Sequence, residues 1–155
     1  LQRLIELVKD YSKVFLSVEG EIPEKLYKYK LPIDPTEIHS ILYYAELFIG
    51  EGATMASECA VLGTPSVYVN SLSAGSLENQ EKENLIHMFN STNGVIEKVE
   101  EILKNDNYKT EQKIIRDKAL EKKVDVNKFM EWFILNYPNS YEKIKENPRL
   151  QYKIK

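Results

Sequence analysis

The sequence predicts an open α/β fold, in which a Rossmann-like parallel sheet carries helices on both faces. Short apolar runs over residues 14–18, 47–50 and 66–70 have the length and the β-branched or aromatic content of buried strands. Segments whose apolar side chains recur at helical spacing separate these runs. Such an alternation of strands and helices is typical of a parallel sheet that helices cover.

Each helix is predicted from its apolar periodicity and from its end signals. Asp34 and Pro35 are typical of a helix start, while Gly63 and Pro65 are typical of a helix end. The small and polar residues 71–79 predict a loop. In chain order the predicted helices cover residues 1–10, 22–28, 37–44, 54–62, 79–89, 93–105, 110–123 and 126–136.

Ligands of such sheets bind beyond the carboxyl ends of the strands, which here are residues 19–20, 51–53 and 70–79. At the second of these places a strand enters a turn with two glycines, Gly50 and Gly52, and continues directly into a helix. The first amides of a helix have no partner within it, and together with the helix dipole they favour anions. This turn therefore predicts a phosphate site.

Two side chains extend this interpretation. Thr54 adds a hydroxyl group, and Glu58 follows four residues later on the same helix face, where its carboxylate is suited to a ribose diol. The alternative is that the glycines serve packing alone and that Glu58 is a surface carboxylate. The spacing of Gly50, Gly52 and Ser57 does not fit the dinucleotide fingerprint, and no P-loop lysine follows.

Residues 31–70 carry a resemblance to known proteins in the segments Leu42-Tyr43-Tyr44-Ala45-Glu46, Gly52, Thr54-Met55, Glu58 and Leu62-Gly63-Thr64-Pro65. This part of the chain resembles the C-terminal domain of GT-B-fold glycosyltransferases and of the non-hydrolysing UDP-N-acetylglucosamine 2-epimerases. It is most similar to an uncharacterised, glycosyltransferase-like family of unknown function. The resemblance weakens towards residue 104 and ends there.

The resemblance implies a UDP-sugar ligand, whose diphosphate would be bound by the backbone amides of Gly52, Ala53, Thr54 and Met55. It implies that Glu58 binds the ribose, and that the extended link containing Leu31 and Ile33 contacts the base through its backbone. Related transferases place acidic and amide side chains on the donor sugar. The corresponding residues here are Glu78, Asn79 and Gln80, although their spacing agrees only loosely.

One departure from this pattern concerns charge. The loop over residues 71–76 lacks a basic side chain, so neutralisation of a diphosphate is left to backbone amides or to a missing half of the protein. Because the chain begins at Leu1, we interpret it as a piece of a longer protein, whose N-terminal domain would supply the acceptor site.

The remaining reactive side chains predict little chemistry. His39 is more typical of a helix surface or core than of a ligand contact, and His87 lies among apolar neighbours. Cys59 is interpreted as a small buried residue, and one cysteine with two histidines offers no metal motif. The sequence therefore predicts no metal, no cofactor and no identifiable catalytic residue.

Composition limits the possible partners. The net charge of −3 offers no bulk attraction to nucleic acid, and no apolar run is long enough to span a membrane. Since no secretion signal is recognisable at the front, a cytoplasmic location is expected. The length of 155 residues predicts one domain, over residues 1–136, with a polar tail over 137–155 that is helical or partly disordered.

Two functions follow from these observations. The favoured one is the donor-binding half of a glycosyltransferase of the hexosyltransferase type, or of a UDP-sugar 2-epimerase, inactive as an isolated piece. The alternative is a non-catalytic α/β interaction domain. In that case the apolar residues of the last predicted helix, Val126, Phe129, Met130, Phe133 and Ile134, would dock a partner rather than form core.

Overall fold

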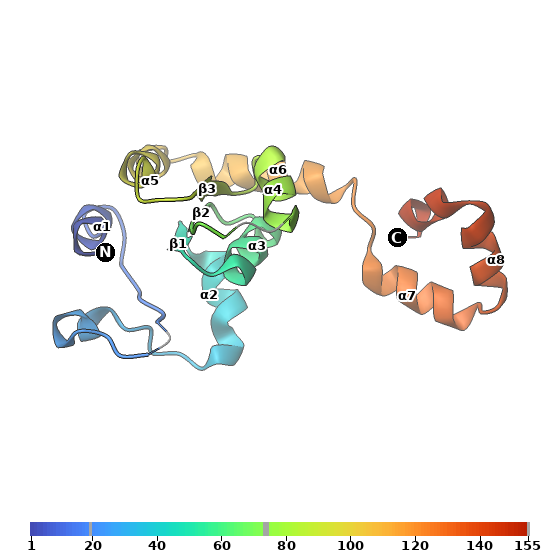
Figure 1. Cartoon of the computed structure of the whole chain (residues 1–155), viewed down its shortest axis with the longest axis horizontal. Coiled ribbons are helices and arrows are strands. Elements are labelled where there is room, and N and C mark those ends of the chain that lie inside the picture. The colour runs from blue at the N-terminus through green and yellow to red at the C-terminus, as the bar shows by residue number, and fades with distance from the viewer. Residues whose placement is uncertain (19, 73–74, 155) are drawn as a thin grey trace. The chain divides into compact units, whose positions relative to one another are not determined.

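A computed structural model describes residues 1–18, 20–72 and 75–154, in two compact units over residues 1–116 and 117–155 (Figure 1). The elements of the first unit are α1 (Gln2–Val8), the 3-10 helices Glu24–Tyr29 and Pro35–Glu37, α2 (Ile38–Tyr44), β1 (Phe48–Gly50), α3 (Ala53–Leu62), β2 (Ser66–Val69), α4 (Gly75–Lys82), β3 (His87–Phe89), α5 (Val95–Lys104) and the first part of α6 (Tyr108–Leu120). The second unit continues with α7 (Val126–Leu135), α8 (Asn139–Glu146) and the 3-10 helix Pro148–Lys153.

The sheet of the first unit confirms the predicted fold class. Its three strands are parallel and lie in the order β1-β2-β3, with Phe48 opposite Ser66 and Val67 opposite His87. Strand β2 is central and is almost entirely buried, because helices cover both of its faces. The sheet is therefore an open, Rossmann-like parallel sheet.

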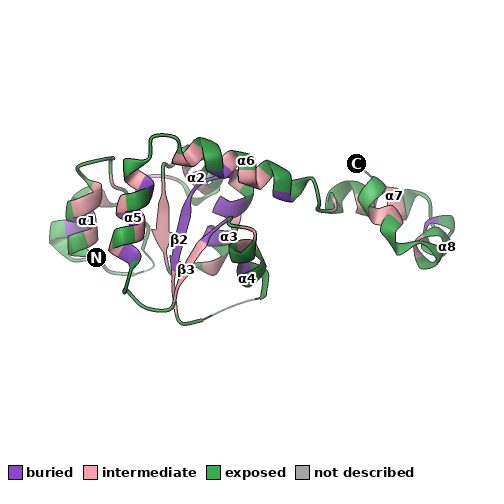
Figure 2. Cartoon of the chain, turned by 90° about the horizontal axis from the view of Figure 1, so that it is seen from above, coloured by how far each residue is buried: buried purple, intermediate pink, exposed green. Residues whose placement is uncertain are grey.

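Helices pack on the two faces of this sheet in separate layers. Val67 points to the face where α5 lies, and its buried cluster contains Val95, Val99 and Ile102, with Leu4 of α1 packed beside them. Tyr68 points to the opposite face, as successive strand residues must, and α3 contacts β1 and β2. Figure 2 shows α1 and α5 on one side of the strands and α3 and α4 on the other.

The predicted strand at residues 14–18 is wrong. Leu16 makes one isolated parallel bridge with Lys30, and Phe15 and Val18 are 47% and 48% exposed. The apolar run has the strand propensity that the sequence indicated, but a segment becomes a strand only where a neighbouring strand pairs with it in a hydrogen-bonded ladder. The only backbone partners of Leu16 among the described residues are Tyr29 and Leu31.

The predicted helix at residues 79–89 is also wrong in its second half. Helix α4 starts earlier, at Gly75, ends at Lys82, and the chain then enters β3 at His87. Asn84 has a φ of 57°, a left-handed conformation that asparagine tolerates and that ends a helix. Leu85 and Ile86 are buried, so the apolar run that suggested a helix face is the entry into a strand.

Other predictions agree with the observed elements. Asp34 accepts hydrogen bonds from the backbone and hydroxyl groups of Thr36, and Gly63 ends α3 with a φ of 75°. The predicted polar tail is helical over Asn139–Glu146 and Pro148–Lys153. The proposed domain over residues 1–136 stays a prediction, because a compact unit is not by itself an independently folding domain.

Among the described residues no helix is both long and apolar enough to cross a bilayer.

Candidate functional site

The start of α3 presents free backbone amides. Gly52 is the residue before the helix and has extended backbone angles, and its carbonyl accepts the first helical bond, from the amide of Ala56. Within the described residues no group accepts a hydrogen bond from the amides of Ala53, Thr54 or Met55. Thr54 is exposed and its two neighbours are half-buried, so an anion can reach these three amides.

The two glycines of the turn differ in what a side chain would meet. A Cβ at Gly50 would lie 2.7 Å from the Phe48 ring, so this glycine is explained by packing. A Cβ at Gly52 would meet only the Cβ of Met55, at 3.9 Å, and the φ of −81° is ordinary for any residue. Neither packing nor conformation therefore requires a glycine at position 52, which leaves open space for a ligand.

Asn70 connects this turn to the end of the neighbouring strand. Its amide group donates to the carbonyl of Glu51 at 3.2 Å, and its carbonyl accepts from the amide of Leu72 at 2.9 Å. Asn70 thus fixes the loop after β2 against the loop after β1. Sequence reasoning identified these loops by their place after strands, but it assigned Asn70 no role. Ser73 and Ala74 of the predicted 71–79 loop, and Glu19 after the first predicted strand, lie outside the described residues.

Glu58 has a protein partner of its own. One of its carboxylate oxygens lies 3.3 Å from Nε2 of His39 on α2, and the two side chains are 33% and 62% exposed. His39 thus lies on the surface of its helix, as the sequence favoured, although its contact with Glu58 was not predicted. A ribose bound at Glu58 would compete with His39 or would use the second carboxylate oxygen.

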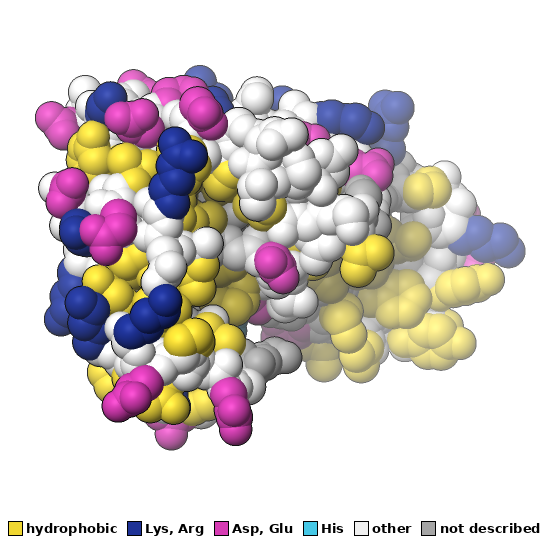
Figure 3. Space-filling model, turned by 60° about the vertical axis from the view of Figure 1, so that its left-hand side comes forward, with side chains coloured by type: hydrophobic (Ala, Val, Ile, Leu, Met, Phe, Trp, Pro, Cys, Tyr) yellow, Lys and Arg dark blue, Asp and Glu magenta, His cyan; other side chains and the backbone are white. Residues whose placement is uncertain are grey.

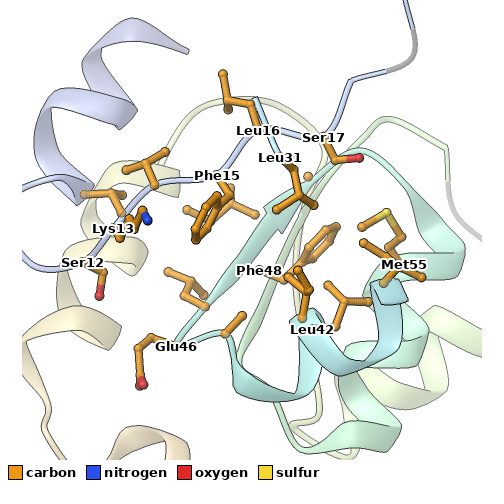
Figure 4. A pocket seen from close by; sticks show the side chains of 18 of the residues that line it. Ser12, Lys13, Phe15, Leu16, Ser17, Leu31, Leu42, Glu46, Phe48 and Met55 are labelled. Carbon is orange, nitrogen blue, oxygen red and sulfur yellow. The ribbon is translucent and has the colours of Figure 1, made fainter. Parts of the chain in front are cut away.

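A large apolar cavity of about 830 Å³ lies beside β1 and reaches the turn at Gly52. Figure 3 shows apolar side chains gathered around a hollow, and Figure 4 shows Phe15, Leu31, Phe48 and Met55 around the cavity. We call it the β1 cavity. Of the predicted site residues, it brings together Leu31, Gly52 and Met55.

The charges along the β1 cavity do not favour an anion. Its lining contains one cation, Lys13, against the carboxylates of Glu37, Glu46 and Glu51. Lys13 lies beside Phe15, with its ammonium group 5.0 Å from the centre of that ring, and away from Met55 (Figure 4). A diphosphate at Gly52 would thus rely on backbone amides or on a missing half of the protein, the two possibilities that the sequence left open.

The predicted base-binding and sugar-binding residues lie in other places. The amide of Leu31 already donates to the carbonyl of Leu16, and Ile33 does not line the β1 cavity. Glu78, Asn79 and Gln80 lie within helix α4 rather than in a loop. The amide group of Gln80 donates to the hydroxyl of Ser57 at 2.8 Å, which attaches α4 to α3.

The second half of the motif is structural. Thr64 is fully buried, and its hydroxyl donates to the carbonyl of Leu42 at 2.7 Å, which fixes α2 against the end of α3. Gly63 has a left-handed conformation, and a Cβ there would lie 3.0 Å from the side chain of Lys113 on α6. Of the motif residues around α3, packing leaves Gly52, Thr54 and Glu58 unexplained.

Burial alters the pKa values of Cys59 and His87. Burial, with a smaller effect of the charge on Glu58, raises the pKa of the Cys59 thiol to about 12, so this cysteine is a poor nucleophile. Burial, with a smaller effect of Lys98, lowers the pKa of His87, whose Nε2 lies 2.6 Å from the hydroxyl of Tyr108. Cys59 belongs to the core, as the sequence indicated, whereas His87 is half-buried in β3. No group of three or more metal-ligating side chains exists among the described residues.

Comparison with known proteins places the chain in a family. The family described as "Protein of unknown function (DUF354)" matches residues 1–137, so the chain belongs to it. No curated protein matches the sequence, and no solved structure matches it.

Proposed function

With membership of this family as the premise, we propose that the chain is the donor-binding half of a nucleotide-sugar-dependent enzyme. The diphosphate of a UDP-sugar would lie at the start of α3, on the amides of Ala53, Thr54 and Met55. The observation that carries the proposal is that these amides have no acceptor among the described residues, next to a glycine that the fold itself does not require. Phosphate binding at helix starts uses this arrangement.

The same geometry supports a chemical role. Amides that point at a departing diphosphate stabilise the charge that develops as its bond to the sugar breaks. Glycosyl transfer and 2-epimerisation both need this stabilisation, so the proposal covers both reactions. The acceptor site and the proton-transferring groups would come from an N-terminal domain, and the reaction would take place in the cytoplasm.

The other ligand contacts extend the proposal. Glu58, one turn into α3, would accept hydrogen bonds from the ribose. Leu31 and Ile33 would contact the base, for which Leu31 retains its carbonyl since its amide is engaged. Glu78, Asn79 and Gln80 would face the sugar from α4, and this is the weakest part, because Gln80 is held by Ser57.

A titration with UDP tests the proposal at single residues. We expect the backbone amide signals of residues 53–55 to shift in NMR spectra, with a dissociation constant on the order of 1 mM for this half alone, about −4 kcal/mol. Ala53→Pro then removes one of the three amides. Proline suits the first position of a helix, and Gly52 already has the extended conformation that a following proline requires.

The expected loss of UDP affinity in Ala53→Pro is large. A hydrogen bond to a charged group contributes about 1.5–3 kcal/mol, which corresponds to a loss of roughly 10- to 100-fold. Val126→Pro is the matched control, because Val126 is the first residue of α7 and also follows an extended residue. Unchanged UDP affinity in Ala53→Pro, or shifts elsewhere than residues 53–55, would remove the diphosphate from α3.

A second titration isolates the ribose contact. Glu58→Gln is expected to weaken UDP binding and to leave pyrophosphate binding unchanged. Equal UDP affinity in wild type and Glu58→Gln would remove Glu58 from the site while leaving the diphosphate proposal in place.

The interaction-domain alternative is also supported by a specific observation. No residue of α7 is buried, and Val126, Met130 and Ile134 are 60%, 53% and 67% exposed, which contradicts a core role for these three. Phe129 packs partly against Phe133 and Trp132, with ring centres 5.8 Å and 6.2 Å apart. If neither UDP nor pyrophosphate binds the chain, this alternative replaces the proposal.

A further inference from the structure

Strand β1 has a hydrogen-bonded neighbour on one side only. Its pairing with β2 uses alternate residues: the amide of Phe48 donates to the carbonyl of Pro65 at 2.9 Å, and Phe48 and Gly50 face β2. The backbone groups of Ile49 therefore face the other edge. No strand of the described residues pairs there.

That edge is half-buried along Phe48–Gly50. It lines the β1 cavity, whose walls are mostly apolar side chains from α1, α2 and the segment before Ser17. Unpaired backbone groups in such surroundings are unfavourable by an amount comparable to a lost hydrogen bond. The cavity thus combines apolar walls with one row of backbone donors and acceptors.

The opposite wall of the cavity has a matching row. Leu16 uses its amide and its carbonyl on the far side, with Tyr29 and Leu31. In an extended chain the neighbouring residues, Phe15 and Ser17, then direct their backbone groups to the cavity, and within the described residues these groups have no backbone partner. In Figure 4 the segment from Lys13 to Ser17 and the chain from Glu46 through Phe48 run the same way past the cavity.

The position of α1 indicates which chain belongs between these two walls. The chain passes from β1 through α3 to β2, and α3 lies on one face of the sheet; crossovers of this kind are right-handed. A right-handed crossover that runs across the sheet in the opposite direction must place its helix on the opposite face. Helix α1 lies on that face, packed on α5 (Figure 2). A strand in the cavity, followed by α1 and then by residues 14–17, forms a right-handed unit of this kind.

We propose that the β1 cavity is the site of a fourth parallel strand, apolar on both faces, which the same polypeptide supplies through a direct connection into α1. The strand pairs with Ile49 on one side and with Phe15 and Ser17 on the other. Residues 14–17 then become the outer strand of a five-stranded sheet. Because the added strand is parallel to β1, its carboxyl end lies beside Glu51 and Gly52. Only this position of the carboxyl end of the added strand connects the proposal with the proposed diphosphate site.

An extended chain tests this proposal. Six alternating valine and isoleucine residues, with a four-residue glycine–serine connection, are placed before Leu1, and in a control chain the same ten residues are placed after Lys155. Hydrogen exchange is measured at the amides of Phe15, Ser17 and Ile49. We expect at least 100-fold slower exchange at these amides in the first chain only, together with a higher denaturation midpoint.

Two substitutions make the test specific. Phe15 and Val18 are equally exposed, at 47% and 48%, but only Phe15 lines the cavity. In the chain extended before Leu1, Phe15→Lys is expected to abolish the added protection, and Val18→Lys to leave it unchanged. Without the added strand, Phe15→Lys and Val18→Lys are expected to have similar denaturation midpoints, both close to that of the parent chain.

Three results would overturn the proposal. The first is unchanged exchange in the chain extended before Leu1. The second is equal protection in the chain extended after Lys155. The third is equal protection from the same strand added as a separate peptide at equimolar concentration, which would assign the site to a strand of another protein. None of these results depends on UDP, so the proposed function is tested separately.

Discussion

Thr64 illustrates how a motif residue can belong to the fold rather than to a ligand. Its hydroxyl is buried and donates to the carbonyl of Leu42, 22 residues earlier in the chain, so it joins the end of α3 to α2. Thr54, in the same motif, is exposed, and its hydroxyl has no hydrogen-bond partner among the described residues. Packing therefore explains Thr64 and gives Thr54 no structural role.

Thr64→Val is expected to destabilise the protein, because it leaves the buried carbonyl of Leu42 without its donor at a cost of about 1–3 kcal/mol. Thr54→Val is the matched control and should leave stability within about 0.5 kcal/mol of wild type. Guanidinium denaturation measures both. Equal stabilities of the two variants would show that the Thr64 hydrogen bond contributes nothing.

His87 gives the fold a pH dependence. Its pKa is lowered from the ordinary 6.5 in the folded protein, mainly by burial. Below pH 6.5 the unfolded chain therefore binds a proton more readily than the folded protein does. Stability is complete above this pH and falls as the pH drops towards the folded-state value.

The measurement compares wild type with His87→Gln between pH 7.5 and pH 5. Wild type is expected to lose more stability over this interval than the variant, which has no titrating ring. Parallel losses in the two proteins would mean that His87 titrates alike in the folded and the unfolded state.

At the scale of elements, the two ends of α3 differ in whether the fold requires a glycine there. Its last turn is closed by Gly63, whose φ of 75° and whose contact with Lys113 leave little room for a Cβ. Its start needs no glycine. Packing therefore explains the glycine at one end of the helix and leaves the glycine at the other end unexplained.

Gly63→Ala is accordingly expected to destabilise the protein by roughly 1–2 kcal/mol, from the left-handed backbone and the close side chain. Gly52→Ala should change stability by less than about 0.5 kcal/mol. Thermal unfolding checks both variants. A Gly52→Ala variant as unstable as Gly63→Ala would show that the turn before α3 is under structural constraint after all.

Elements were predictable from sequence where local signals sufficed. The helix caps at Asp34 and Gly63 and the strand–turn–helix segment at residues 47–62 depend on neighbours in the chain, and they were found. Residues 87–89 were mistaken for helix, because a short apolar run fits either a strand or a buried helix face and only the pairing with β2 distinguishes the two. The signal that could have found this strand is Asn84, a helix-ending residue in front of it.

The candidate site was predictable in part for the same reason. The free amides at residues 53–55 follow from the position of a helix start, which the sequence shows. The contacts of Glu58 with His39 and of Gln80 with Ser57 join different helices, so no local pattern could indicate them. Asn70 was missed because its hydrogen bond to Glu51 crosses between two strand ends.

At the scale of the whole molecule, the sequence by itself determined the fold class, the order of most elements and the helix start that faces the carboxyl edge of the sheet. These features depend on periodicity and on turn residues, which act over a few positions of the chain. The tertiary structure alone decided that residues 14–18 stand apart from β1, that residues 87–89 complete the sheet, and that an apolar cavity adjoins the predicted site. Strand pairing and cavities depend on which distant segments come into contact. Burial of apolar surface stabilises such contacts, but it leaves no local pattern in the sequence.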